Sequence, residues 1–185
     1  FPGHSLVETL VSLPLVMPPV ATGLILLKVL GRDGMVGGFL ERLGIDIVFT
    51  WKAVVLAMAV MGLPLLVRTA RSGFEQVSRR YEDIAETLGA TPTRVFFTVS
   101  LPLASRSIVA GALLAFSRAI GEFGATIMVA GSIPGRTRTL SVAIFTMTEA
   151  GNDRQAMTLL VIAVAIGFVA IFITNGLLRR DHVAV

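Results

Sequence analysis

Two ionisable side chains, Arg118 and Glu122, lie in an otherwise apolar stretch of the sequence. They are four residues apart, so on a helix they face each other and can form an ion pair. A charged side chain at the centre of a bilayer costs about 2.5 to 3.5 kcal/mol, and such residues usually face a bundle interior, a polar cavity or each other. The pair therefore has two interpretations: a structural ion pair that fixes helix register, or part of a translocation pathway.

A proline-rich apolar segment, LPLVMPPVATG, extends this list of candidates. Its prolines remove backbone donors and clash with preceding carbonyls, so we expect a kinked or locally open helix. A membrane tolerates such a helix only where neighbouring protein or a cavity satisfies the freed carbonyls. We therefore expect this segment to lie near a pathway, with a purely structural kink as the alternative. The candidate pathway residues are Pro18, Pro19, Arg118, Glu122 and Thr126.

Motifs for catalysis and nucleotide binding are missing from the sequence. It contains no GxxxxGK[ST] phosphate loop, no HExxH, no GxSxG and no carboxylates with metal-ligand spacing. It has no cysteine, and His4 and His182 stand at opposite ends. We therefore expect no catalytic residue, metal ligand or cofactor in this chain, and any nucleotide that drives it must sit on another polypeptide.

The elements that must position these residues are apolar helices. Of the 185 residues, 54% are hydrophobic and only 15% charged, whereas a typical soluble domain has about 25% charged residues. Four windows approach the roughly 20 residues that a membrane-spanning helix needs: Leu10–Leu30, Trp51–Val67, Ile108–Ala130 and Met157–Leu178. They predict an all-α polytopic membrane bundle that forms a single transmembrane domain over residues 1–185. The alternative, a large soluble helical bundle, would need polar faces that these windows lack.

Small residues in the second half of the segment Leu103–Gly131 predict close helix packing, with gating flexibility as the alternative. They are Gly121, Gly124, Ala125 and Gly131.

Basic residues indicate the orientation of the chain. The net charge of +4 could suggest nucleic acid, but arginines gather around the central polar loop and after the last window, at Arg179 and Arg180. By the positive-inside rule, the central loop and the C-terminus are cytoplasmic. The loop Gly31–Thr50 is then external, with an expected short interfacial helix near Phe39, and the apolar run from Leu140 is expected to dip into the bilayer. Because the sequence begins at Phe1 without methionine, we expect an upstream span to be missing.

The central polar loop, Arg71–Pro102, carries an apolar stripe. Phe74, Val77, Tyr81, Ile84 and Leu88 recur at spacings of three and four, which predicts one amphipathic helix that ends at Gly89. Its charged flanks are Arg79, Arg80, Glu82 and Glu86. Such a helix fits either a subunit interface or the lipid headgroups.

The segment DIAETLGATPTRVFFTVSLP, Asp83–Pro102, resembles the cytoplasmic signature of permease subunits of ABC importers: EAA, three residues, glycine, nine residues, isoleucine or valine, one residue, and LP. Ala85, Gly89, Val99, Leu101 and Pro102 match, whereas Asp83 and Ile84 depart from the usual Glu and Ala. The resemblance implies two short coupling helices that turn at Gly89 and dock in a cleft of an ATP-binding subunit. The candidate coupling residues are Phe74, Val77, Tyr81, Asp83, Ile84, Ala85, Leu88, Gly89 and Pro102.

A second resemblance concerns the substrate. Ala112–Phe145 and Leu13–Gly23 resemble permeases for tetrahedral oxyanions, and GEFGAT followed by IPG is closer to the molybdate type than to the sulfate type. The resemblance implies an inner-membrane importer subunit that works as a homodimer in the lipid bilayer. Its implied partners are ATPase subunits, which would bind ATP and Mg, and a periplasmic oxyanion-binding protein. An oxyanion would not be attracted by Glu122 unless Arg118 neutralised it, so we expect this pair to fix register rather than to bind substrate.

Several alternatives stay open from the sequence. They are a sulfate or tungstate permease of the same kind, a secondary anion transporter or channel without an ATPase, and a membrane scaffold without a pathway. A secondary transporter would be expected to carry ion-coupling carboxylates or repeated broken helices, and Glu122 is the only acid in the apolar windows.

Overall fold

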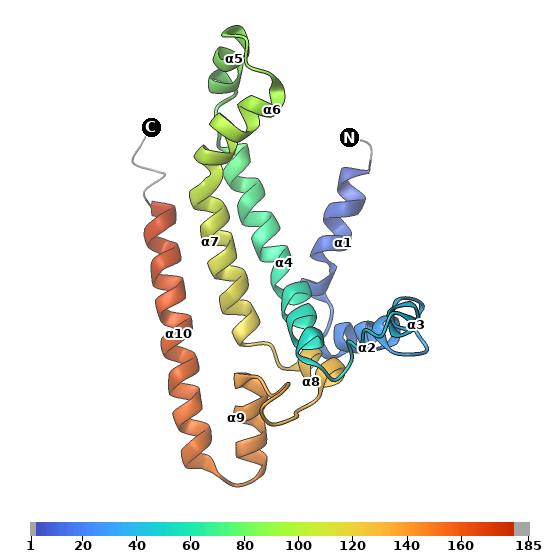
Figure 1. Ribbon diagram of the computed structural model, residues 1–185. Helices are drawn as coiled ribbons and strands as arrows, with labels where there is room; N and C mark the ends of the chain where they lie inside the picture. Colours follow the sequence, from blue (N-terminus) through green and yellow to red (C-terminus); the bar gives the residue numbers. More distant parts are fainter. Residues whose placement is uncertain (1–2, 180–185) are drawn as a thin grey trace.

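The fold was examined in a computed structural model that describes residues 3–179, and all regular structure in that range is helical (Figure 1). The all-α prediction is therefore confirmed. In chain order the helices are α1 (His4–Val16), α2 (Pro19–Leu30), α3 (Met35–Arg42), α4 (Trp51–Glu75), α5 (Arg79–Thr87), α6 (Pro92–Val95), the π-helix η1 (Phe96–Ser100), α7 (Leu101–Ile120), α8 (Gly124–Ala130), α9 (Leu140–Glu149) and α10 (Asp153–Arg179). Arg180 and His182 lie outside the described residues.

Within residues 3–179, three helical segments are long and apolar enough to cross a membrane: α4, the continuous run of α6, η1 and α7 over Pro92–Ile120, and α10. A fourth span results if α1 and α2 are counted together. The windows at Trp51 and Met157 are thus confirmed as helices, and α4 continues well beyond the predicted end at Val67.

The third window, Ile108–Ala130, is not one helix as predicted. The helix begins earlier, at Leu101, and α7 ends at Ile120 before α8 starts at Gly124. The break is stabilised by the Glu122 carboxylate, which accepts a hydrogen bond from the Ala125 backbone N–H at 2.7 Å. One of the backbone N–H groups at the N-terminus of α8, which lack partners within the helix, is thereby satisfied.

The first window is broken at its prolines, as predicted. Helices α1 and α2 meet at a bend of 118°. Met17, which precedes Pro18, has extended backbone angles, because the residue before a proline is disfavoured in the helical region. Pro14, in contrast, lies inside α1 without ending it. As a result α2 runs across the bundle instead of along it (Figure 1).

The long helices form a row in which α7 lies between α4 and α10 (Figure 1). Close approach of α4 and α7 depends on glycines: a Cβ on Gly62 would lie 2.9 Å from the Ala115 carbonyl oxygen, and one on Gly73 would lie 2.3 Å from Ser107 Cβ. Small residues allow such packing in lipid, where apolar burial alone gives little drive for association.

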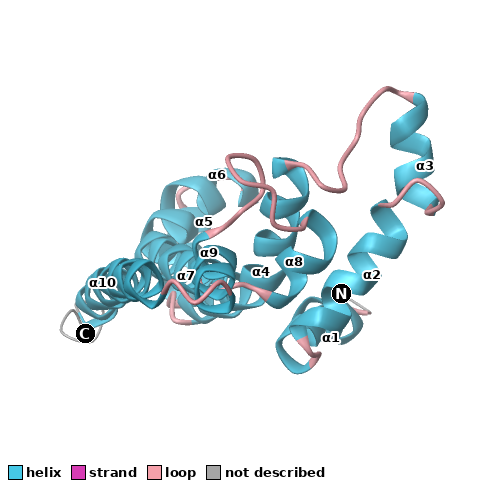
Figure 2. Cartoon of the chain, turned by 90° about the horizontal axis from the view of Figure 1, so that it is seen from below, coloured by secondary structure: helices cyan, strands magenta, loops and turns pink. Residues whose placement is uncertain are grey.

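At one end of the row, α8 packs against α2 and α4. Ala53, Ala57 and Met61 of α4 form the core there with Ala125, Val129 and Ala130 of α8. Seen from below, α2 and α3 extend away from the side of the bundle where α10 lies (Figure 2). Helix α3 confirms the short helix predicted around Phe39, and α9, which packs along α10, contains the apolar run at Leu140.

Candidate functional site

The central loop is the first candidate site, and its predicted single helix over Phe74–Leu88 is wrong. Helix α4 ends at Glu75 and α5 begins at Arg79, because Ser78 is extended, with φ −65° and ψ 124°. The Gln76 side chain turns back and donates to the Ser72 carbonyl oxygen at 3.1 Å, which ends α4. Phe74 and Val77 therefore do not share a helix face with the residues of α5. Phe74 instead stacks on Phe96 of η1, with ring centroids 5.9 Å apart.

Helix α5 carries an unpartnered apolar face. None of its residues, all of which the structure describes, is buried. Tyr81 is 56% exposed, Ile84 48%, and the following residue Leu88 84%. These residues, named here the α5 apolar face, keep the spacing of three and four that was predicted. Full burial of one such side chain is worth about 1.5 to 3 kcal/mol, so the face can support a subunit contact.

Gly89 ends α5 as predicted. It has a φ of +85°, which glycine adopts without steric cost. The Gly89 N–H donates to the Glu86 carbonyl oxygen at 2.9 Å, and the Ala90 N–H donates to that of Ala85 at 3.0 Å. This pair of bonds is the Schellman arrangement that closes a helix. The chain then reverses into α6, which gives the two short helices about Gly89 that the resemblance implies.

A contact that the sequence did not reveal joins α5 to the membrane span. Ser100 Oγ, in the π-helix η1, donates to Glu82 Oε1 at 2.6 Å, and Ser100 is only 6% exposed. The π-helix leads into Pro102, which has no N–H and would crowd the preceding turn of an α-helix. No periodicity or motif marks Glu82, because its partner is eighteen positions away. Asp83, on the same helix, is exposed.

Arg118 and Glu122 form the ion pair predicted from their spacing, with Arg118 Nη1 2.8 Å from Glu122 Oε2. Glu122 is 1% exposed, and its other oxygen holds the Ala125 N–H. Both oxygens are thus occupied by groups of this chain. The pair spans the break between α7 and α8, a geometry that suits a structural ion pair better than a substrate ligand.

The remaining pathway candidates gather where α2 crosses α8. A Cβ on Gly124 would lie 2.9 Å from Pro19 Cβ, and one on Gly23 would lie 2.7 Å from Ala125 Cα. The close packing predicted for Gly124 and Ala125 is confirmed. Pro18 and Pro19 are exposed, whereas Thr126 is fully buried. The hydroxyls of Thr126 and Thr22 have no hydrogen-bond partner within the described residues.

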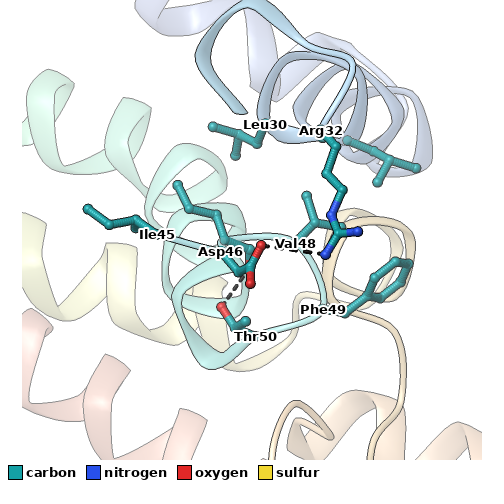
Figure 3. A pocket seen from close by; sticks show the side chains of 10 residues that line it. Leu30, Arg32, Ile45, Asp46, Val48, Phe49 and Thr50 are labelled. Atoms are coloured by element: carbon teal, nitrogen blue, oxygen red, sulfur yellow. Dashed lines mark hydrogen bonds and ion pairs between the residues drawn. The ribbon is translucent and has the colours of Figure 1, made fainter. Parts of the chain in front are cut away.

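A cavity of about 580 Å³ lies between the end of α2 and residues 45–50 (Figure 3), far from α5 (Figure 1). Two residues of its lining form an ion pair, with Arg32 Nη2 3.9 Å from Asp46 Oδ1. Arg32 Nε also lies 3.2 Å from Glu41 Oε1, which is not part of the lining. The loop is fastened to the crossing, because the Phe49 N–H donates to the Val129 carbonyl oxygen at 3.1 Å. Phe49 has a φ of 59°, a rare conformation for a residue with a side chain. No three His, Cys, Asp or Glu side chains in residues 3–179 lie close enough to hold a metal ion.

A second groove, of about 450 Å³, separates α1 from α4. The residues that line it are Ser5, Glu8, Thr9, Ser12, Leu13, Val16 and Arg68. Sequence reasoning missed this site, although the polar residues of α1 recur at spacings of three and four. The first apolar window began at Leu10 and so divided the pattern.

Spanning helices, the bent pair α1–α2 and an amphipathic loop with an exposed apolar face define a multi-pass membrane protein. Comparison with known proteins gives the class. The family described as binding-protein-dependent transport system inner membrane component matches residues 2–181. The chain belongs to this family and is an inner-membrane component of a transport system.

Curated relatives share most of this length. The molybdenum transport system permease protein ModB of Escherichia coli K12 is 44% identical over 184 residues, which cover 97% of this chain and 79% of that protein. The protein of the same name from Haemophilus influenzae is 38% identical over 182 residues, covering 97% and 80%. The sulfate transport system permease protein CysT of Escherichia coli K12 is 36% identical over 180 residues, covering 97% and 65%.

Proposed function

We propose that this chain is the membrane-spanning permease subunit of an ATP-driven importer for a tetrahedral oxyanion, and that the oxyanion is molybdate. The observation that carries the importer class is the loop α5–Gly89–α6, where an exposed apolar face and the ABC-permease signature coincide. Higher identity to the molybdenum permeases than to the sulfate permease favours molybdate. Sulfate and tungstate are the alternative substrates.

The α5 apolar face is the docking surface for an ATP-binding subunit in this proposal. Leu88, the most exposed of its side chains, would enter the cleft of that subunit, and the charges of Arg79, Arg80 and Glu86 would set its orientation rather than its affinity. Phe74 and Val77 support the loop from the end of α4. Asp83, Ala85, Gly89 and Pro102 keep the roles that the signature implies.

The permease itself performs no bond chemistry in this proposal. ATP and Mg are bound by the ATPase subunit, so the chain carries no catalytic residue or cofactor of its own. Residues 1–185 act as one transmembrane domain, and two copies line a pathway. Binding of ATP draws the coupling loops of the two copies together, and their separation after hydrolysis returns the cavity to the inward-facing state.

Orientation and external partner follow from the same scheme. The central loop and the C-terminus face the cytoplasm. A periplasmic oxyanion-binding protein delivers substrate to the opposite face. The dependence on a binding protein in the family description supports such a partner. Pro18, Pro19 and Thr126 lie near the pathway, and Arg118 and Glu122 fix the break between α7 and α8.

The test is uptake of labelled molybdate in a strain whose only copy of this permease comes from a full-length gene, with sulfate and tungstate as competitors. We expect uptake that depends on the ATPase subunit and that excess sulfate reduces little. Uptake that persists without any ATP-binding partner would instead support a secondary transporter. Anion uptake that is intact after deletion of the gene would support a scaffold.

A further inference from the structure

The groove between α1 and α4 has an unusual lining for a segment of a membrane helix pair. Ser5, Glu8, Thr9 and Ser12 all lie on one face of α1, and Arg68 approaches this face from α4. The other face of α1 is apolar and exposed, with Val7 at 50% and Leu10 at 60%. Helix α1 thus has one polar and one apolar face. Together with α2 it forms a segment long enough to cross a bilayer.

A polar face at membrane depth needs protein or water beside it, because lipid cannot satisfy its hydrogen-bonding groups. The nearest protein is α4, and a volume of about 450 Å³ remains open between the two helices. Such a volume exceeds the space that several waters need. We infer that the groove is filled with water, or with a polar solute, in the assembled transporter.

One cation of the groove, Arg68, could meet an anion. Glu8 lines it, but Glu8 Oε2 lies 2.5 Å from Arg71 Nη1, and Arg71 also contacts Glu75 at 2.6 Å. Glu8 and Glu75 thus share the single guanidinium of Arg71, and the three groups together carry a net charge of −1. Arg68, the only basic residue in the lining of this groove, makes no ion pair or hydrogen bond to any of the described residues, so its guanidinium is available to an anion.

Hydroxyl donors for a small oxyanion line the same groove as Arg68. Thr9 Oγ1 already donates to the Ser5 carbonyl oxygen at 2.7 Å. The hydroxyls of Ser5 and Ser12 have no partner among the described residues and are free to donate. A guanidinium and two hydroxyls match a tetrahedral oxyanion, because charge-assisted hydrogen bonds to its oxygens are the strong ones.

We propose that the α1–α4 groove is a subsite for the transported oxyanion, with Arg68 as its cationic ligand and Ser12 and Ser5 as hydroxyl donors. The proposal rests on the proposed function for the identity of the anion. It places a substrate contact on the coupling-loop side of the α1–α2 bend, where α4 leads directly to α5. Occupation of the subsite would thus be adjacent to the helix that enters the coupling loop.

The experiment is thiol labelling, for which the cysteine-free sequence is well suited. Ser12→Cys is made in the full-length permease, purified with its ATPase subunit in the absence of nucleotide, and treated with a negatively charged, membrane-impermeant methanethiosulfonate. Modification at position 12 is followed by mass spectrometry of the peptide that carries it, so thiols elsewhere in the complex do not contribute. We expect fast modification, because only a water-exposed thiol ionises and reacts.

Protection by substrate tests the ligand. With sodium molybdate at about ten times its dissociation constant for the Ser12→Cys complex, labelling of the thiol is expected to slow about tenfold. Sodium chloride at equal ionic strength is the control, since salt alone screens an anionic reagent. Leu10→Cys, on the opposite face of the same helix, is the matched variant and is expected to react slowly with or without molybdate.

Arg68 supplies the second arm. In the Ser12→Cys background, Arg68→Gln is expected to slow labelling by the anionic reagent, yet to leave it faster than that of Leu10→Cys, and to remove protection. Arg68→Lys is expected to retain at least part of the protection. A thiol at position 12 that reacts no faster than one at position 10, or that molybdate does not protect, overturns the subsite. Failure of the proposed function would show differently, as a wild-type complex that lacks ATP-dependent molybdate uptake.

Discussion

The loop α5–Gly89–α6 and the crossing of α2 with α8 differ in how far their side chains are buried within this chain. None of the residues of α5 is buried, and its apolar face is open. At the crossing, Gly124, Ala125 and Thr126 are buried, and no room is left for a Cβ on Gly23 or Gly124. The loop therefore leaves apolar surface exposed in this chain, whereas the side chains of the crossing are covered within it.

This difference indicates what each region tolerates. On an exposed apolar face, a change of charge or polarity should alter binding to another protein without loss of the fold. A crossing made of small residues is sensitive to volume, because interiors are close-packed and respond to a single added methyl group. Substitutions should consequently separate assembly from folding.

The largest effect is expected at Glu122, where the crossing begins. Glu122→Ala leaves the Ala125 N–H and the Arg118 guanidinium without their buried partner. Removal of one member of a buried pair costs about 3 to 5 kcal/mol, so we expect a large fall in thermal stability in detergent. Thermal unfolding of the purified permease is the measurement.

Glutamine variants sharpen this result. Glu122→Gln can still accept from Ala125, so it should cost less than Glu122→Ala. Arg118→Gln and Glu122→Gln together should cost less than the sum of the single changes, because the two side chains contact each other. Additive losses would show that the pair is not a unit.

At the coupling loop, Leu88→Asp should leave stability unchanged and weaken assembly with the ATPase subunit. Loss of one buried leucine is worth about 1.5 to 3 kcal/mol, which corresponds to roughly ten- to hundredfold in the dissociation constant. Co-purification and equilibrium binding measure the effect. Glu86→Ala, a change of a polar residue on the same helix, is the control and should leave the dissociation constant nearly unchanged.

The sequence revealed the loop better than the crossing, and the reason is physical. The face of α5 repeats with the helical period, and Gly89 marks its end by a backbone conformation that few residues adopt. The end of α4 was missed because Gln76, Val77 and Ser78 include no proline or glycine. Their departure from the helix depends on the Gln76 side chain and on packing of Phe74 against Phe96.

At the crossing, the sequence predicted the small residues and the ion pair but not the arrangement. Hydropathy runs straight through Gly121 and Glu122, so one window covered α7 and α8. The break depends on a carboxylate that serves two segments at once, which no periodic pattern encodes. The prolines at positions 18 and 19 predicted a kink correctly, yet the bend of 118° depends on how α2 packs against α8.

A volume change at the crossing gives the third effect. Gly23→Ala brings a Cβ within 2.7 Å of Ala125 Cα, a backbone atom that cannot move aside alone. Overpacking of this kind costs about 1 to 3 kcal/mol. Gly176→Ala in α10 is the control, since a Cβ there meets nothing within 4 Å. Equal melting temperatures for the two variants would argue against tight packing of α2 on α8.

The smallest effect is expected where the loop meets the span, at the hydrogen bond between Ser100 Oγ and Glu82 Oε1. Its loss in Glu82→Ala or Ser100→Ala should cost about 1 kcal/mol, too little to unfold the protein or to prevent docking of α5. Because this bond ties α5 to η1, we expect the variants to hydrolyse ATP normally while transporting less molybdate per ATP. Glu82→Gln keeps an acceptor for Ser100 and should restore the ratio, and the double variant Glu82→Ala with Ser100→Ala should be no worse than either single one. If the ratio of uptake to hydrolysis is unchanged in all of them, motion passes from α5 to the span through the Phe74–Phe96 contact instead.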